Sequence, residues 1–310
     1  MVLSLMKREA LIRSIEKLKD AQNIIILAHN YQPPEIQDIA DFLGDSLDLS
    51  LKATKTTADR IVFCGVDFMA ESAKILNPSK TVIHPEPQAK CPMAGMVEPD
   101  MLTVMKQKHP KAAVVSYINT TADVKALTDI CCTSANGQRV VRHCSEDQII
   151  FVPDVNLGLY IQRSITDKEL ILWPGICPTH HAIDPIELTT LKQQHPTAEI
   201  LVHPECRPAV IDIADHVFST SGMVHHAKKS DTTEFIIGTE KDMCYRLQTE
   251  NPEKIFYPVE SAICPNMKKI TLEKVLKSIT NCHPTVELSP SIMAKAKQPL
   301  QKMMDIGRGD

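Results

Sequence analysis

Three Cys-Pro dipeptides divide the chain at nearly equal intervals, and cysteine is a residue that can hold a metal. The dipeptides begin at Cys91, Cys177 and Cys264, which lie 86 and 87 residues apart. The 10 cysteines and 21 prolines of the 310-residue chain form no other Cys-Pro pair. Even spacing of one unusual pair indicates an internal repeat. We therefore expect three thiols at equivalent positions of three related units, where they could meet and bind a metal.

The kind of metal follows from the ligand type and from what the sequence lacks. Thiolates select zinc, copper(I) or iron–sulfur clusters, and structural zinc sites use four ligands that often come from CxxC pairs. The chain contains no CxxC motif. Three isolated cysteines favour a 4Fe-4S cluster with one iron open to substrate, where it could act as a Lewis acid. The alternative is three buried thiols that only pack as small apolar groups.

Other residues recur with the same period of about 87 residues and support the repeat. The polar ends of three β-type runs are His29, Tyr117 and His203. A serine follows each of these runs, at Ser46, Ser134 and Ser221. An acid follows a later run in each repeat, at Asp67, Asp154 and Glu240. Such agreement predicts three repeats. The segment after Thr271, with TLEKVLKSI and SIMAKAKQPLQKMM, has a helical pattern, and we expect this tail to pack on the first repeat. We place the repeats and the tail at residues 1–97, 98–184, 185–270 and 271–310.

The expected fold class is α/β. Short apolar runs alternate with helical segments and show no polar alternation, which is typical of parallel strands buried on both faces. Strand–helix–strand order predicts βαβ units with right-handed crossovers. Each repeat should then be a three-layer α/β/α domain with a parallel sheet. Units of this size bury little surface alone, so the three homologous domains should pack around one axis.

The candidate substrate side chains follow predicted strands, and ligands of open parallel sheets bind beyond the carboxyl ends of the strands. Residues two apart in an extended segment point the same way. Three such pairs could supply proton carriers and amide donors: His29 and Tyr31, Tyr117 and Asn119, His203 and Glu205.

Three hydroxyl residues stand where helices are expected to begin, namely Ser46, Ser134 and Thr220. Helix N-termini bind anions, so three of them facing one cavity would suit a substrate with carboxylates or a phosphate. The alternative is capping without a ligand. His180 lies three residues after Cys177, where the other repeats have Ala94 and Met267. It could act near the metal or only support a ligand.

Composition excludes several classes of protein. Lys and Arg total 34 against 38 Asp and Glu, a net charge of −4, which argues against a general nucleic-acid binder. No apolar stretch approaches the length of a membrane span, and the order of apolar and charged residues at the start is unlike a signal peptide. We expect a cytoplasmic protein whose cysteines are thiols, ligands or catalytic groups and not disulfides.

From about Ile24 to Leu276, the sequence resembles the quinolinate synthase family, iron–sulfur enzymes of bacterial and archaeal NAD biosynthesis. The resemblance is carried by stretches such as LAHNYQPPEIQDIADFLGDSL, SYINTTADVKALTDICCTSAN, LWPGICPTHH, HPECRP and CPNMKKITLEKV. It implies condensation of iminoaspartate with dihydroxyacetone phosphate to quinolinate, phosphate and water. It also implies three α/β domains around a pseudo-threefold axis and, as supplier of the imine, L-aspartate oxidase.

The resemblance also implies roles for particular residues. It implies a 4Fe-4S cluster on Cys91, Cys177 and Cys264. The matched positions for substrate binding are His29, Ser46, Tyr117, Asn119, Ser134, His203, Glu205 and Thr220, and those for proton transfer are Tyr31, Glu205 and His180. The family commonly has His where this chain has Asp67 and Glu where it has His181, which leaves the proton routes near these two residues open. Two other functions remain open: an iron–sulfur hydro-lyase acting on a hydroxy acid, and a non-enzymatic zinc-binding scaffold.

Overall fold

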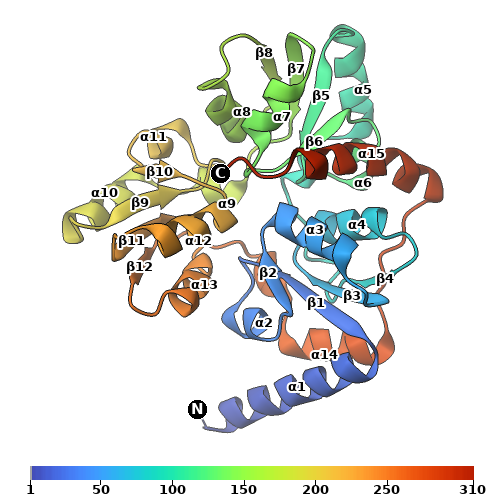
Figure 1. Cartoon of the computed structure of the whole chain (residues 1–310), viewed down its shortest axis with the longest axis vertical. Coiled ribbons are helices and arrows are strands. Elements are labelled where there is room, and N and C mark those ends of the chain that lie inside the picture. Colours follow the sequence, from blue (N-terminus) through green and yellow to red (C-terminus); the bar gives the residue numbers. More distant parts are fainter. Residues whose placement is uncertain (1) are drawn as a thin grey trace.

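The computed structural model describes residues 2–310 and the side chains from residue 6 onward. The described chain begins with α1 (Val2–Ala21), and three α/β units follow (Figure 1). In Figure 1 the first unit lies at the lower right, the second at the top and the third at the left. The three sheets therefore surround the middle of the molecule.

Each unit contains one four-stranded parallel sheet, and the strand order is the same in all three. The first sheet has the order β2-β1-β3-β4, with β1 (Ile24–His29), β2 (Phe42–Gly44), β3 (Arg60–Cys64) and β4 (Thr81–Ile83). The second has the order β6-β5-β7-β8, with β5 (Ala113–Tyr117), β6 (Ile130–Cys132), β7 (Gln148–Val152) and β8 (Glu169–Leu172). The third has the order β10-β9-β11-β12, with β9 (Glu199–Val202), β10 (His216–Val217), β11 (Glu234–Gly238) and β12 (Ile255–Pro258).

Helices connect the strands and cover the sheets. The first unit has α2 (Pro34–Asp38), α3 (Ser46–Lys55), α4 (Asp67–Leu76) and the 3-10 turn η1 (Ala94–Met96). The second has α5 (Pro99–Lys108), α6 (Ala122–Lys125), α7 (Gly137–His143), α8 (Val155–Gln162) and α9 (Pro178–His181). The third has α10 (Pro185–Gln194), α11 (Pro208–Ile211), α12 (Thr220–Lys229), α13 (Met243–Glu250) and η2 (Met267–Lys269). The chain ends with α14 (Leu272–Asn281) and α15 (Pro290–Ile306).

The strand register repeats along with the strand order. Leu27 pairs with Phe42, Val115 with Ile130 and Leu201 with His216. The central strands are apolar and buried, as β5 is along its whole length, because helices cover both faces of a parallel sheet. The predicted fold class, α/β with three α/β/α domains and parallel sheets, is confirmed.

One apolar core joins the three units. Its buried members include Leu27 and Phe63 from the first unit, Val115 from the second and Leu201 from the third. Each unit also has a smaller outer cluster of its own. Burial of apolar surface against the neighbouring units is the expected remedy for units too small to bury enough surface alone.

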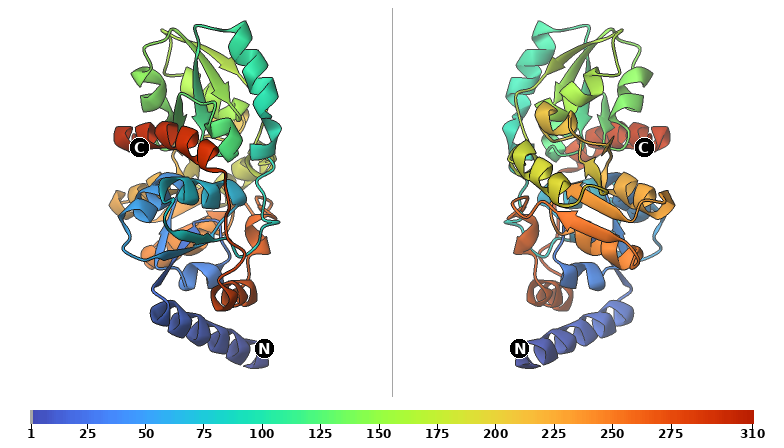
Figure 2. Two further views of the ribbon diagram at one scale, coloured as in Figure 1. Left: turned by 90° about the vertical axis from the view of Figure 1, so that its right-hand side faces the viewer. Right: turned by 90° about the vertical axis from the view of Figure 1, so that its left-hand side faces the viewer.

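The C-terminal tail contacts all three units and not only the first repeat. Helix α14 lies against α1, whereas α15 packs on β6, α6 and α4. Figure 2 shows α15 lying between the second unit and the first. The residues after α15 reach the third unit, where the Asp310 carboxylate accepts the Ser219 N–H at 3.1 Å. The expected limits of the repeats stay a prediction.

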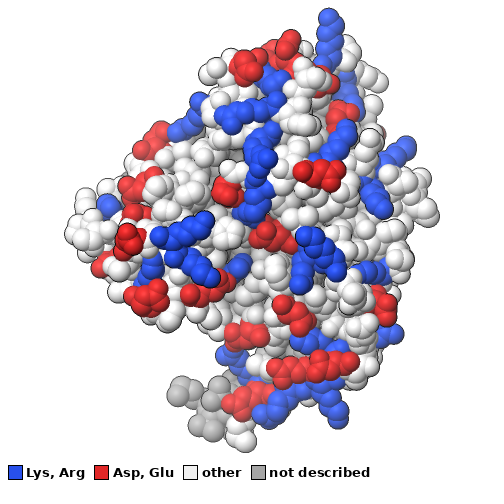
Figure 3. Space-filling model, in the orientation of Figure 1, with Lys and Arg blue, Asp and Glu red and all other residues white. Residues whose placement is uncertain are grey.

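The surface carries both signs of charge. In Figure 3, basic and acidic side chains are interspersed over the visible face, with no wide area of one sign. Within residues 2–310, no helix combines the length and apolar character needed to cross a bilayer.

Candidate active site

One cavity at the carboxyl ends of the central strands contains every site residue that the sequence predicted. About 910 Å³ of space in and before it is free of protein atoms, open solvent at its mouth included. The predicted residues that line it are His29, Tyr31, Ser46, Cys91, Tyr117, Asn119, Ser134, Cys177, His180, His203, Glu205, Thr220 and Cys264. They come from all three units, so the cavity exists only in the assembled molecule.

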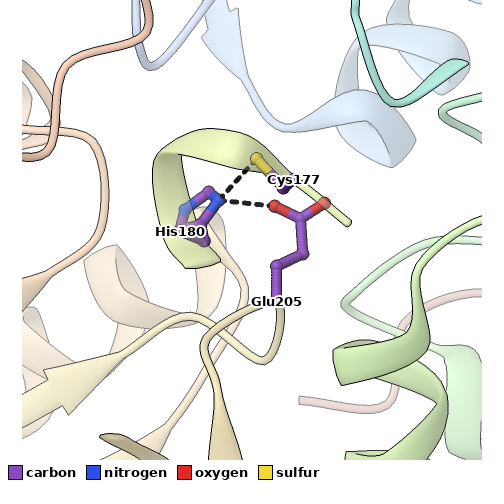
Figure 4. Close-up of side chains that lie close together, drawn as sticks. All are labelled: Cys177, His180 and Glu205. Atoms are coloured by element: carbon purple, nitrogen blue, oxygen red, sulfur yellow. Dashed lines mark hydrogen bonds and ion pairs between the residues drawn. The ribbon is translucent and has the colours of Figure 1, made fainter. Parts of the chain in front are cut away.

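Glu205 belongs to a tight polar group in this cavity, and Figure 4 shows it beside His180 and Cys177. Its Oε2 is 2.7 Å from His180 Nδ1 and 3.3 Å from His203 Nδ1. His180 Nδ1 is also 3.2 Å from the Cys177 Sγ, and the His180 and His203 rings stack with centroids 4.6 Å apart. Helix α9 carries His180, and the turn after β9 carries His203 and Glu205.

Glu205 is ionised although it is only 3% exposed. Burial alone would raise its pKa, but the facing His180 and His203 imidazoles outweigh burial and lower the pKa below its usual value. Its other oxygen, Oε1, is buried and has no hydrogen-bond partner among the described residues. Leaving a buried carboxylate oxygen without a hydrogen-bond partner costs free energy. This atom is therefore well suited to accept a proton or a hydrogen bond from a ligand.

A hydrogen-bond chain leads from Tyr31 to Glu205. The Tyr31 hydroxyl is 2.5 Å from Thr239 Oγ1 and 3.3 Å from His180 Nε2, and His180 Nε2 is 2.8 Å from the same threonine oxygen. Burial raises the pKa of Tyr31 well above 10, so this phenol keeps its proton. The arrangement can move a proton between Tyr31 and Glu205 through His180.

His29 is a neutral imidazole in the cavity wall. Burial, the largest influence, lowers its pKa to about 3. Its Nδ1 accepts the Tyr31 N–H at 3.1 Å, so in the neutral ring the proton resides on Nε2 and can be donated. Burial also lowers the pKa of His203. The neutral His29 ring can bind an anion through a hydrogen bond and not as an ion pair.

The amide and hydroxyl candidates come from all three units. Asn119 Oδ1 is buried without a hydrogen-bond partner among the described residues. Ser46 and Thr220 are the first residues of α3 and α12, as expected. Ser134 is not at a helix start, because Asn136 Oδ1 accepts the Thr133 N–H at 2.7 Å and closes a turn before α7 begins at Gly137.

The three cysteines share a backbone contact that sequence reasoning did not assign. In each unit, a carboxylate at or just before a helix start accepts the N–H of the Cys-Pro cysteine. The pairs are Asp67 with Cys91 at 3.0 Å, Asp154 with Cys177 at 2.9 Å and Glu240 with Cys264 at 3.3 Å. The common period of these acids was a signal of the contact, although it gave no role. Each thiol is thereby held at the edge of the cavity.

The donor set fits a thiolate-bound metal cluster. All three thiols are free, and burial raises the pKa of Cys91 to about 12 and raises those of Cys177 and Cys264. Without a cation they stay protonated, whereas a coordinating thiol loses its proton. One soft donor from each unit suits an iron–sulfur cluster better than an oxygen-preferring ion. Cys177, His180 and Glu205 also bring one donor atom each within 4.8 Å of the others.

Comparison with known proteins agrees with this site. Residues 13–305 match the family model described as quinolinate synthetase A protein. A quinolinate synthase of Thermodesulfovibrio yellowstonii is 50% identical over 296 residues, covering 95% of this chain and 98% of the relative. One from Dehalococcoides mccartyi is 49% identical over 302 residues, covering 97% of this chain and 100% of the relative.

The chain belongs to the quinolinate synthase family. It is therefore an enzyme, because relatives named quinolinate synthase are about half identical to it over nearly their whole length.

In this member of the quinolinate synthase family, a tail residue also shapes the cavity wall. Asp45 lines the cavity and caps α3 through the Leu47 and Asp48 N–H groups. Arg308 Nη1 contacts Asp45 at 2.9 Å. Burial would raise the pKa of Asp45, but Arg308 outweighs burial and lowers the pKa. Sequence spacing gave no signal for this pair, because its two members lie 263 residues apart.

Proposed function

We propose that this enzyme condenses iminoaspartate with dihydroxyacetone phosphate to quinolinate, phosphate and water, as a step of NAD biosynthesis. One observation carries the proposal: a single cavity gathers one thiol from each unit and an ionised glutamate with a free oxygen. Membership of the quinolinate synthase family supports the same product.

Cys91, Cys177 and Cys264 would hold the 4Fe-4S cluster, since each is a free thiol at the cavity edge. When bound, the cluster supplies a Lewis-acidic iron that can polarise substrate oxygen or nitrogen. The carboxylates on Asp67, Asp154 and Glu240 hold the cysteine backbone in position, which limits how far each thiol can move.

The substrates are anions, and the cavity would bind them largely without fixed positive side chains. Its lining contains neither Lys nor Arg among the described residues. The N-termini of α3 and α12, at Ser46 and Thr220, can donate N–H hydrogen bonds to carboxylate or phosphate oxygens. The neutral His29 and the Asn119 side chain add hydrogen bonds that fix orientation.

Glu205 is the proposed proton carrier. Its free Oε1 can take a proton from substrate carbon or nitrogen, and the His180–Thr239–Tyr31 chain can return protons during aromatisation. Apolar residues that include Val66, Phe68 and Met69 line part of the same cavity. Their presence limits water, which matters because an imine hydrolyses in water.

We also propose that the enzyme works in the cytoplasm and receives iminoaspartate from an aspartate-oxidising enzyme such as L-aspartate oxidase. The proposal rests on the chemistry of the imine, which hydrolyses readily and must be used soon after it forms.

The direct test is an oxygen-free assay. Protein with measured iron and sulfide is supplied with dihydroxyacetone phosphate, L-aspartate and L-aspartate oxidase, and quinolinate is quantified by chromatography. We expect quinolinate only when all components are present. Protein with an intact cluster that forms no quinolinate would reject the function, and protein that instead dehydrates a hydroxy acid would support a hydro-lyase.

A further inference from the structure

A second group of ligand-type side chains lies in the third unit, at the uncovered edge of its sheet. It consists of Glu199, His216 and His226, which we call the edge triad. His226 Nε2 is 2.8 Å from Glu199 Oε2, and His216 Nε2 is 3.8 Å from the same oxygen. One donor atom from each residue lies within 4.8 Å of the other two. None of the three lines the active-site cavity.

Three different elements position the edge triad. Glu199 is the first residue of β9, His216 is the first residue of the edge strand β10, and His226 lies on α12. Figure 1 shows these elements together at the left of the molecule. The register pairs His216 with Leu201, which is two residues from Glu199 and therefore on the same face of the sheet. Helix α12 brings the third donor to this face.

The edge triad is supported by further contacts. Thr232 Oγ1 donates to Glu199 Oε1 at 2.6 Å, which turns the other oxygen toward the histidines. The His216 ring stacks on Phe218 with centroids 5.5 Å apart, and His226 meets the Phe235 ring edge-on at 6.0 Å. Hydrogen-bonded carboxylates and sterically fixed imidazoles are the usual surroundings of metal ligands.

The three residues are peculiar to the third unit. The strand register and the start of the helix that follows place Ile25, Phe42 and Lys52 at the equivalent positions of the first unit. Ile25 and Phe42 pack against the core, and the Lys52 Nζ lies 5.1 Å from the centroid of the Phe42 ring. The second unit has Ala113, Ile130 and Val140 there. In the third unit alone, all three positions carry side chains that can ligate a metal.

A simpler interpretation is that an exposed edge strand carries polar residues for solubility. That accounts for one polar residue at β10, but not for two imidazoles that point at one carboxylate oxygen. The His216 and His226 ring centroids are 4.5 Å apart, so both rings lie beside the same carboxylate oxygen. One metal ion could bind a nitrogen of each ring and this oxygen, because the three donor atoms lie within 4.8 Å of one another. Two nitrogens and one oxygen are a common zinc ligand set.

We propose that Glu199, His216 and His226 bind zinc or a similar divalent transition metal ion. The side chains of these residues are 27%, 40% and 21% exposed, so an ion can enter from solvent and keep water as a further ligand. The ion would join β9, β10 and α12, and it would stabilise the fold by binding the native state only. Its binding requires neither the cluster nor the proposed reaction.

The test compares zinc stoichiometry among full-length variants with unchanged cysteines. Wild-type protein, His216→Gln, His226→Gln and the control His225→Gln are purified without oxygen, dialysed against buffered Zn²⁺ and analysed by mass spectrometry for bound metal. His225 is the neighbour of His226 on α12, and it is exposed. We expect wild type and His225→Gln to bind one zinc ion more than the other two variants. We also expect zinc to raise the unfolding temperature of wild type and His225→Gln but not of His216→Gln and His226→Gln.

Equal zinc content in all four proteins would overturn the proposal, as would an equal effect of zinc on their unfolding temperatures. If His226→Gln fails to fold, His216→Gln alone decides the outcome, because its side chain is the most exposed of the three.

Discussion

At the scale of single residues, the cavity is defined by which groups keep their protons. Glu205 is ionised because His180 and His203 face it, whereas burial keeps Tyr31 protonated and His29 neutral. A base, a phenolic donor and a neutral imidazole donor therefore coexist within one enclosed space. This separation of protonation states is what general acid–base chemistry requires.

Replacing Glu205 by Gln tests the proton-carrier role. The amide keeps the size of the side chain but cannot accept a proton, so quinolinate formation should fall about 100-fold or more. Iron and sulfide content should stay unchanged, because the substitution spares the three cysteines. The measurement is the initial rate under anaerobic conditions together with the visible spectrum. Full activity in the variant would remove Glu205 from proton transfer.

At the scale of elements, helix starts and Cys-Pro turns are coupled. Asp154 caps α8 by accepting the Leu157 N–H at 2.7 Å, and its second oxygen accepts the Cys177 N–H. Asp67 and Glu240 make the corresponding cysteine contact in the other two units. One carboxylate per unit thus fixes the turn that presents a thiol to the cavity.

The substitution Asp154→Ala should loosen one thiol as well as one helix. Loss of the cap should lower the free energy of unfolding by about 1 kcal/mol, and the bound iron and sulfide per chain should decrease. Asp184→Ala is the matched control, because Asp184 caps α10 through the Ile186 N–H at 2.9 Å, whereas the Cys177 N–H donates to Asp154.

The control should lose similar stability, measured by denaturant unfolding, and keep its iron. If both variants retain iron equally, the carboxylate at position 154 only caps its helix.

At the scale of the whole molecule, the end of the chain connects the three units. Arg308 contacts Asp45 and Asp48 of the first unit, the Gly309 N–H donates to the Ala135 carbonyl of the second, and Asp310 contacts Ser219 of the third. The wall of the cavity at Asp45 therefore depends on a segment that is remote in sequence.

Removing this cation should make stability depend differently on pH. Arg308→Ala leaves Asp45 buried without its cation, which should cost about 1–3 kcal/mol at pH 7, less than for a fully buried pair because the Arg308 side chain is 20% exposed. In the wild type the pKa of Asp45 is lowered. Its stabilising contribution is therefore complete above the unfolded-state pKa of about 4 and is lost as the pH falls further.

The stability difference between Arg308→Ala and wild type should be largest at neutral pH, where Asp45 is ionised in both proteins. It should shrink as the pH falls, because Asp45 takes up a proton first in the variant, where burial raises its pKa unopposed, and only later in the wild type. Denaturant unfolding across this pH range measures the difference, with Lys297→Ala as a control that removes an exposed cation from α15. A difference that stays the same at low pH would contradict the role of Asp45.

The sequence by itself determined the three repeats, the parallel sheets and half of the residues that line the cavity. It could do so because buried strands and residues at strand ends leave periodic, local patterns, as His29, Tyr117 and His203 do. The tertiary structure alone decided which side chains meet across the repeats. Glu205 with His180, Arg308 with Asp45 and the edge triad depend on packing between distant segments, and local sequence patterns carry no record of such packing.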